Sequence, residues 1–526
     1  MKPYPFAQAV LNRRRFLQIT GGVTVATLAG CLAPGEIAPT TSRDDASIRT
    51  PQRGGTLRVA FPGAALQLDP AFLGSYEEFH IMLAAYDRLI NLDDRLTAQP
   101  ALATAWHVAS DGLSWDFELR QGVTFHHGLP FTAKDVVYTF ERIFDPTLAS
   151  PVAAVISFVD HVEAVDEFTA RFYLKLPNAD LPVWLAGPDF AISAHDRGTE
   201  ALQTAASGTG PFRLTDFVSG DHAHFVRNES YWQADLPYVN ELHFLYIPES
   251  ATQVAALLSG EIDVMWQLGF ENIAALEAAE NVQLFETPGG GTNPIVMRVT
   301  EEPFTDVRVR QALKHCVDRA GMRQVVLQGR GELGNDQSIP PVSSFWAEIE
   351  PLPYDLEKAK ALLTEAGYAD GLDLTLVTST VRPGMVESAV AFQEMVKQAG
   401  INIAIEMAPA ASYWDTVWLQ APFSMSNWGL LATADEILSQ QEHSTSEWNE
   451  SAFSDPRVDA AIEAARSEND PTKRYEYYAQ AQEIIVNEGG RIIPYFRPAL
   501  SAARSNVNGL TPSPLELMHF YSVWLA

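Results

Sequence analysis

Cysteine is scarce in this chain of 526 residues, where Cys31 and Cys316 are the only two. That number excludes a framework of several disulfides and leaves a single bond between the two formally open. Basic residues are also few, since 36 Lys and Arg stand against 66 Asp and Glu and give a net charge of -30. A surface of this sign repels phosphate backbones, so we expect no nucleic-acid partner.

The N-terminal hydrophobic stretch, Phe16–Ala29, is shorter than the roughly 20 residues that a helix needs to cross a bilayer. Arg13-Arg14-Arg15 precedes it and Leu28-Ala29-Gly30-Cys31 ends it. A positive start, an apolar run and a small-residue cleavage site in this order are typical of a secretory signal peptide. A chance cluster of arginines before an apolar start is the alternative.

The residues around this stretch resemble two known export signals. Arg13-Arg14-Arg15-Phe16-Leu17 is similar to the twin-arginine signal, and the segment ending at Cys31 resembles a lipobox. These resemblances imply twin-arginine export, cleavage before Cys31 and diacylation of its sulfur. Two acyl chains anchor a protein stably to a membrane. We expect residues 1–30 to be a signal peptide and 31–52, rich in Pro, Ser, Thr and Asp, to be a flexible tether.

The chain lacks several common catalytic motifs: it contains no G-x-S-x-G, Walker A, H-E-x-x-H or C-x-x-C. We therefore expect no enzyme and no cofactor. Carboxylates are too numerous to pair by sequence, so an extracellular hydrolase remains an alternative, as does a chaperone or signalling role. His222 and His224 would share one strand face and form half of a metal site, but no third ligand stands nearby in the sequence, so we expect no metal.

Hydrophobic periodicity predicts a mixture of strands and helices. Residues 113–120 and 170–176 alternate between apolar and polar, which indicates half-buried strands, and a helix with a capped start at Thr132 lies between them. Residues 372–377, 386–399 and 401–407 read as a strand, a helix and a strand. Cys316 falls on the apolar stripe of another helix and is expected to be a buried thiol. The class is therefore α/β.

Several ordered segments resemble the family 5 extracellular solute-binding proteins of ABC importers, the peptide, dipeptide and nickel class. The resemblance runs from about residue 54 to 498, and the segments that carry it are Leu113–Arg142, Gly208–Phe212, Arg227–Trp232, Leu257–Val264, Pro303–Leu313 and Ala359–Gly367.

This resemblance implies a two-lobed periplasmic binding protein fold with an extra inserted domain and a hinge of two crossing strands. Glycines suit such a hinge. The implied crossings lie near Gly289-Gly290-Gly291 and near Ile492–Phe496. The implied domains are lobe I at 53–78, 206–292 and 493–526, an insertion in that lobe at 79–205, and lobe II at 293–492.

The same resemblance implies a periplasmic, membrane-anchored and monomeric protein that binds a small solute by lobe closure and passes it to an ABC permease. Related proteins carry an Asp or an Arg shortly after a Trp-Gly pair, whereas here Leu431 follows Trp428-Gly429. We expect a peptide or an amino-acid-derived solute. The missing charged groups leave a sugar or an opine-like conjugate as the alternative.

Aromatic and polar side chains in loops or after strand ends are the candidate ligand contacts. Trp and Tyr offer large surfaces at a low entropy cost, and fixed polar groups replace the water that a bound solute loses. Arg382 suits a carboxylate and Asp435 an ammonium. The full set of candidates is Trp428, Trp266, Gln267, Asn293, Tyr76, Trp414, Arg382, Trp346 and Asp435.

Overall fold

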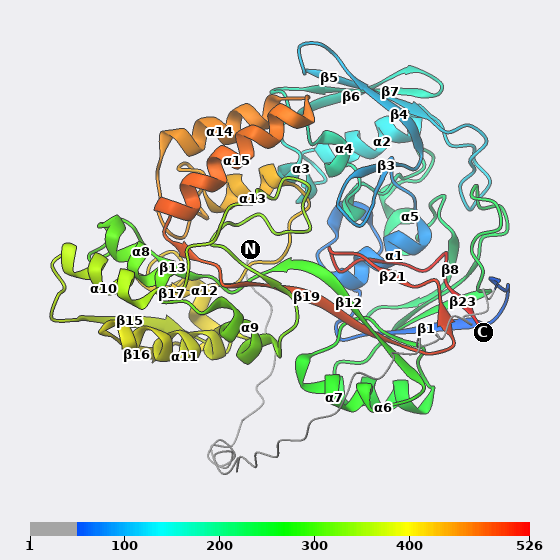
Figure 1. The fold of residues 1–526 in the computed structure, drawn as a ribbon. Coiled ribbons are helices and arrows are strands. Elements are labelled where there is room, and N and C mark those ends of the chain that lie inside the picture. The colour runs from blue at the N-terminus through cyan, green and yellow to red at the C-terminus, as the bar shows by residue number, and fades with distance from the viewer. Residues whose placement is uncertain (1–49) are drawn as a thin grey trace, which may run out of the picture. The chain divides into compact units, whose positions relative to one another are not determined.

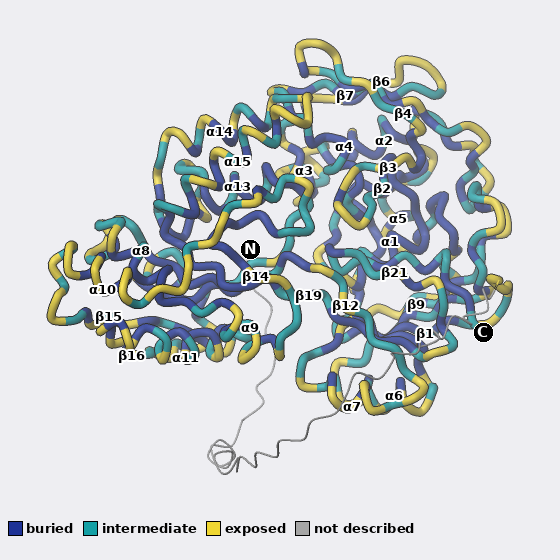
Figure 2. Tube along the Cα trace, in the orientation of Figure 1, coloured by how far each residue is buried: buried dark blue, intermediate teal, exposed yellow. Residues whose placement is uncertain are grey.

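The computed structural model describes residues 50–526, so the predicted signal peptide and Cys31 lie outside the described residues. Residues 51–526 form one compact unit of mixed α/β structure (Figure 1). Its strands belong mainly to three sheets. Figure 2 shows buried stretches along β1 (Thr56–Phe61) and exposed ones at the loops of the third sheet. None of the described helices combines the length and the apolar character needed to span a membrane.

The first sheet mixes parallel and antiparallel strands and has helices on both faces. Its order is β12 (Val282–Gly291), β19 (Tyr495–Arg504), β11 (Val264–Met265), β1 (Thr56–Phe61), β10 (Glu241–Tyr246), β9 (His222–Arg227) and β8 (Phe212–Val218). Leu57, Val59 and Phe61 of β1 pack in the same apolar cluster as α1 (Tyr76–Ala85). Ala60 packs on the opposite face in the cluster that holds α6 (Ser250–Ser259) and α7 (Ile273–Glu277).

The second sheet has the order β16 (Ile401–Met407), β15 (Leu372–Thr378), β17 (Phe423–Met425), β13 (Ile295–Met297) and β18 (Arg491–Ile492). Strands β15 and β16 run parallel and are joined through α11 (Met385–Val396), which confirms the predicted strand-helix-strand unit. Helices α8 (Val307–His315), α9 (Arg319–Leu327) and α10 (Leu356–Glu365) share its core. Cys316 is fully buried there, as predicted, and burial raises the pKa of its thiol to about 12.

A layer of helices adjoins the second sheet. Its members are α13 (Ala434–Gln441), α14 (Pro456–Ser467) and α15 (Pro471–Glu488), and they share one apolar cluster. Asp470 begins α15 by accepting hydrogen bonds from the backbone N–H groups of Thr472 and Lys473. This cap satisfies two of the donors that a helix start leaves free.

The third sheet is antiparallel, in the order β4 (Ala103–Val108), β5 (Ser114–Leu119), β7 (Thr169–Leu174) and β6 (Val159–Asp166). Helix α2 (Ala133–Phe144) packs on it and begins with a capping box of Thr132 and Asp135. The two strands and the capped helix predicted for this region are confirmed. The sheet has its own apolar core, drawn from residues 89–194.

The chain passes between the first two sheets twice. It leaves the first sheet along β12 and enters the second at β13, and it returns from β18 along β19. Strands β12 and β19 run side by side and antiparallel (Figure 1). Their register shifts between Thr287 and Gly291. A Cβ on Gly289 would lie 2.4 Å from the carbonyl oxygen of Arg497, so only glycine allows this approach. The predicted hinge of two crossing strands is present, while the domain boundaries stay predictions.

Candidate functional site

Arg497 lies at the start of β19, opposite Gly291 of β12, where both crossings run side by side. Gly291 leaves room for the guanidinium, because a Cβ there would lie 3.0 Å from Nη2 and 3.3 Å from Nε. Nη2 donates a long hydrogen bond of 3.4 Å to the carbonyl oxygen of Trp428. The crossing therefore brings an arginine from one strand against the segment that contains Trp428.

Trp428 is fixed to the crossing by its backbone. Its N–H donates to the carbonyl of Thr292 at 3.0 Å, and its own carbonyl accepts from the N–H of Thr292 at 2.9 Å. Its ring lies beside Trp448, with centroids 6.3 Å apart, and the guanidinium of Arg491 lies 5.7 Å from its centroid. The indole thus has a second aromatic ring and a buried cation as neighbours.

Two donors at this junction lack a partner. The Nε of Arg497 and the Nε1 of Trp428 are buried, and neither has a hydrogen-bond partner among residues 50–526. A buried donor left without a partner costs about 1–3 kcal/mol. Both groups donate and neither accepts. The chemistry that would satisfy them together is an acceptor such as a carboxylate.

An aromatic cluster is formed by α1 and by Trp266, which directly follows β11 of the first sheet. The rings of Tyr76 and Trp266 have centroids 5.2 Å apart, and His80 lies 5.4 Å from Trp266. The indole Nε1 of Trp266 donates to the backbone carbonyl of Glu516 at 2.7 Å. Ser75 caps α1 by accepting from the N–H of Glu78, and this places Tyr76 in the first turn with 39% of its surface exposed. An aromatic face is therefore available beside charged groups.

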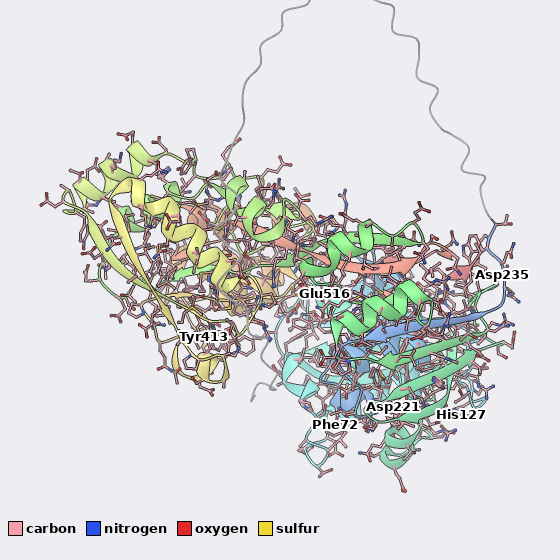
Figure 3. All side chains as sticks on the ribbon, turned by 90° about the horizontal axis from the view of Figure 1, so that it is seen from below. Phe72, His127, Asp221, Asp235, Tyr413 and Glu516 are labelled. Carbon is pink, nitrogen blue, oxygen red and sulfur yellow. The ribbon has the colours of Figure 1, made fainter. Side chains whose placement is uncertain are left out.

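Glu516 connects the aromatic cluster to Arg497. Burial raises the pKa of the Glu516 carboxyl, and the positive charge of Arg497 acts against this shift. Burial likewise lowers the pKa of Arg497, to which Arg382 adds, while Tyr495 and Glu516 oppose it. In the described chain the two charges form no ion pair within 4.0 Å. Figure 3 shows Glu516 beside the crossing strands and Tyr413 in the half that holds the second sheet.

The comparisons with known proteins identify the kind of protein that carries this site. Residues 97–449 match the family described as bacterial extracellular solute-binding proteins, family 5 Middle. The chain belongs to this family. The resemblance predicted from the ordered sequence segments is thereby confirmed, and the crossing of β12 and β19 is the junction of a two-lobed solute-binding protein.

Similar proteins support the membership in this family, and the similarity covers most of their length. Heme-binding protein A of Haemophilus influenzae is 28% identical over 472 residues, with 83% of this chain and 86% of that protein covered. The glutathione-binding protein GsiB of Salmonella paratyphi A is 27% identical over 448 residues, with coverages of 82% and 86%. The structure of HbpA2 from Haemophilus parasuis matches with a TM-score of 0.82 at 24% identity and covers 90% of this chain and 100% of that one, which shows the same fold.

Four residues predicted as ligand contacts are linked to Arg497, either directly or through Glu516. They are Trp428, Trp266, Tyr76 and Arg382. Arg382 is exposed and near enough to Arg497 to affect its pKa.

Three further predicted residues differ in their exposure. Asn293 is fully buried, and its Nδ2 donates to the carbonyl of Pro383 at 3.0 Å and to the hydroxyl of Tyr495 at 3.3 Å. Trp346 lies edge-on against Phe496, with centroids 6.1 Å apart. Gln267 follows Trp266 and is exposed. Asn293 thus holds the two crossings together through bonds of its own.

The last two predicted residues have partners within the protein. Trp414 packs against the core of the second sheet, with Tyr413 and Trp418 as ring neighbours. Asp435 is buried, and both of its oxygens lie 3.0 Å from the Nε of Arg466. A ligand ammonium would have to compete with that arginine for Asp435.

Arg497 and Glu516 are candidate site residues that the sequence did not indicate. Arg497 follows the second predicted crossing by one residue, and a charged side chain so close to a hinge was the available signal. Glu516 lies in a C-terminal turn without a motif, and its φ of 61° places it in the left-handed region. Such backbone conformations are uncommon for residues other than glycine and gather at functional sites.

Proposed function

We propose that this protein captures a small solute with a free carboxylate, of the peptide or amino-acid-derived class, at the crossing of β12 and β19. The observation that carries the proposal is the pair of buried donors without partners, Arg497 Nε and Trp428 Nε1. A ligand carboxylate would accept from both. Glu516 would receive the ammonium of a zwitterionic solute, and Tyr76 would cover an apolar part.

The names of the relatives agree with this chemistry. One relative is named for glutathione and the other for heme, and both compounds carry free carboxylates. Hydrogen bonds to charged groups contribute about 1.5–3 kcal/mol each, so a few of them with aromatic contacts give a reversible complex. Closure of the two lobes would follow from the preference of the solute for the closed form.

The decisive experiment compares Arg497→Ala with Arg213→Ala. Arg213 is an exposed arginine on β8 and serves as the matched control. Native mass spectrometry of gently purified protein first identifies a carried solute, with dipeptides, tripeptides, glutathione, hemin and a neutral sugar as the alternative panel. In calorimetric titrations the substitution Arg497→Ala is expected to lower the affinity for the preferred solute about 10- to 100-fold, because a charged hydrogen bond is lost.

Replacing the solute carboxylate by an amide should lower the affinity of the wild-type protein by a similar factor. The affinity of Arg497→Ala should stay almost unchanged. Equal affinities of wild type and Arg497→Ala would refute a carboxylate contact at this position. Preference for a neutral sugar would support the non-peptide alternative.

We also propose the route by which the protein reaches its place of action. It would leave the cytoplasm by the twin-arginine pathway, be cleaved before Cys31, and remain on the membrane as a monomeric lipoprotein that serves an ABC permease. Arg13–Leu17 and Leu28–Cys31 support this proposal through their resemblance to the two signals. Radiolabelled palmitate should label the wild type and not Cys31→Ser. Labelling of Cys31→Ser would exclude the lipobox assignment.

A further inference from the structure

Histidines form a row on the face of the first sheet opposite α1. Ala223 and Phe225 of β9 point into the core shared with α1, so His222 and His224 point to the other face. Asp216 of β8 stands opposite His224, and His243 of β10 stands on its other side. The ring centroids of His222 and His224 lie 4.3 Å apart.

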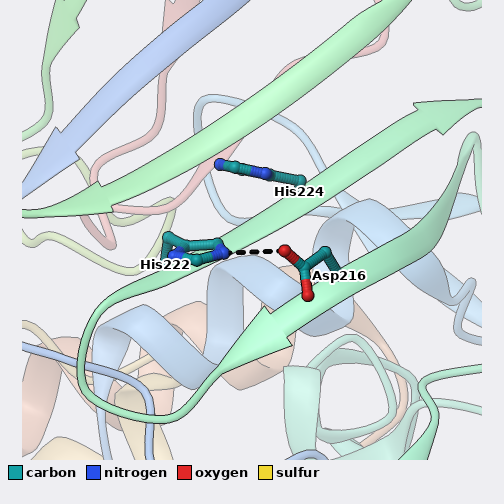
Figure 4. Close-up of side chains that lie close together, drawn as sticks. All are labelled: Asp216, His222 and His224. Atoms are coloured by element: carbon teal, nitrogen blue, oxygen red, sulfur yellow. Dashed lines mark hydrogen bonds and ion pairs between the residues drawn. The ribbon is translucent and has the colours of Figure 1, made fainter.

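Asp216 supplies the third group that was missing from the sequence neighbourhood of the two histidines. Its Oδ2 lies 2.9 Å from Nε2 of His222 (Figure 4). One carboxylate oxygen of Asp216 and one ring nitrogen from each of His222 and His224 all lie within 4.8 Å of one another. The register shift of β8 between Leu214 and Asp216 brings the carboxylate to this position.

The surroundings suit a ligand set in two further respects. Within residues 50–526, neither ring nitrogen of His224 has a hydrogen-bond partner, so a lone pair is available. The other nitrogen of His222, Nδ1, lies 2.7 Å from Oδ2 of Asp221. A carboxylate that accepts from the far nitrogen of a metal-binding histidine fixes the ring and raises its basicity.

We propose that Asp216, His222 and His224 bind a divalent transition-metal ion of the zinc class on the outer face of the first sheet. Imidazole and carboxylate are ligands that Zn²⁺ accepts, and three protein ligands leave a fourth position for water. Zn–N and Zn–O distances of about 2.0–2.2 Å place tetrahedral ligand atoms about 3.3 Å apart. Exposed or half-buried side chains reach this spacing by small rotations. The site is separate from the junction at Arg497.

The ion would join two strands at the edge of the sheet. Strand β8 is an edge strand that pairs only with β9 among the described strands. Asp216 belongs to β8, whereas both histidines belong to β9. Binding would therefore hold the shifted edge strand against its neighbour and raise the thermal stability of the protein by mass action.

The test uses the full chain, purified without a polyhistidine tag and stripped of metal with a chelator. Titration with Zn²⁺ against a chromogenic chelator is expected to give one equivalent bound at micromolar or lower dissociation constant. Asp216→Asn, His222→Gln and His224→Gln should each weaken binding at least tenfold and abolish the Zn²⁺-dependent rise in melting temperature.

His161→Gln is the matched control. His161 also lies between two carboxylates, with Asp160 at 2.9 Å and Glu163 at 3.7 Å. It is on β6 of the third sheet, and the other histidine of that sheet, His107, is on β4, which does not pair with β6. The His161→Gln variant should bind Zn²⁺ with the same affinity as the wild type. Three outcomes would overturn the proposal: no tight equivalent in the wild type, equal binding in the three variants, or loss of binding in His161→Gln alone. Circular dichroism of each variant excludes misfolding as the cause.

Discussion

At the scale of single residues, the site is built by side chains that are far apart in the sequence. Trp428 and Arg497 come together because β12 and β19 cross beside the Trp428 segment. Trp266 is linked to Arg497 through Glu516. The aromatic residues could be predicted, since loop tryptophans and tyrosines in a binding protein are natural contacts. Arg497 and Glu516 could not, because their significance arises from burial and from missing partners, which sequence patterns do not show.

His80 gives a prediction about acid stability. It is fully buried, with Nδ1 2.6 Å from the carbonyl of Tyr76 and Nε2 accepting from the N–H of Met518 at 3.2 Å. Burial lowers its pKa from 6.5 to about 4, and its hydrogen bond to Tyr76 acts against the shift. Between these values the unfolded chain binds a proton that the folded chain does not. The free energy of unfolding therefore falls as the pH drops from 6.5 towards 4.

Between pH 7 and pH 5, the lowered pKa of His80 should reduce the free energy of unfolding by about 2 kcal/mol. Urea unfolding at the two values should show that His80→Gln loses less stability on acidification than the wild type, by this amount. His161→Gln, at an exposed site, should behave as the wild type. Identical pH dependence of wild type and His80→Gln would contradict a neutral buried imidazole.

At the scale of secondary-structure elements, local patterns predicted the elements well. The strand-helix-strand unit ending at Met407 and the capped helix beginning after Thr132 follow from periodicity and capping chemistry. Which strands pair with one another, and in which register, was harder to predict from the sequence. The position of Asp216 opposite His224 depends on a shift of register that no local pattern specifies, so the sequence suggested only the two histidines of the proposed metal site.

The close approach of the two crossing strands at Gly289 leads to a prediction about stability. In Gly289→Ala the new Cβ would meet the carbonyl oxygen of Arg497 at 2.4 Å, and this neighbour is backbone. Separating the strands should lower the free energy of unfolding by about 1–3 kcal/mol. Gly429→Ala is the control, because nothing lies within 4 Å of its Cβ, and it should stay within about 0.5 kcal/mol. Equal midpoints of urea unfolding for both variants would contradict the close approach.

At the scale of the whole described unit, a second contact joins the helical layer to the region of the third sheet. Asp180, which precedes α4 (Leu181–Trp184), forms a buried ion pair with Arg474 of α15. Nearby, the N–H of Ala179 donates to the carbonyl of Arg466 at 2.9 Å. The residues that make these contacts belong to neither of the crossing strands β12 and β19. The family resemblance predicted the two lobes, but the partners of Asp180 required the assembled fold.

Removing one partner of this pair leaves a buried charge alone, so Asp180→Ala should lower the free energy of unfolding by about 3–5 kcal/mol. The double variant Asp180→Ala/Arg474→Met should recover part of this loss, because it removes the second charge as well. A double-mutant cycle by urea unfolding measures the coupling. Strictly additive effects would show that the two side chains do not interact.

The central claim is that a solute carboxylate completes the junction at Arg497. The most direct measurement is a crystal structure of the protein with its solute bound. We expect an acceptor atom of the solute within about 3.2 Å of both Arg497 Nε and Trp428 Nε1, close to the aromatic face of Tyr76. A solute bound without contact to either donor would contradict the account.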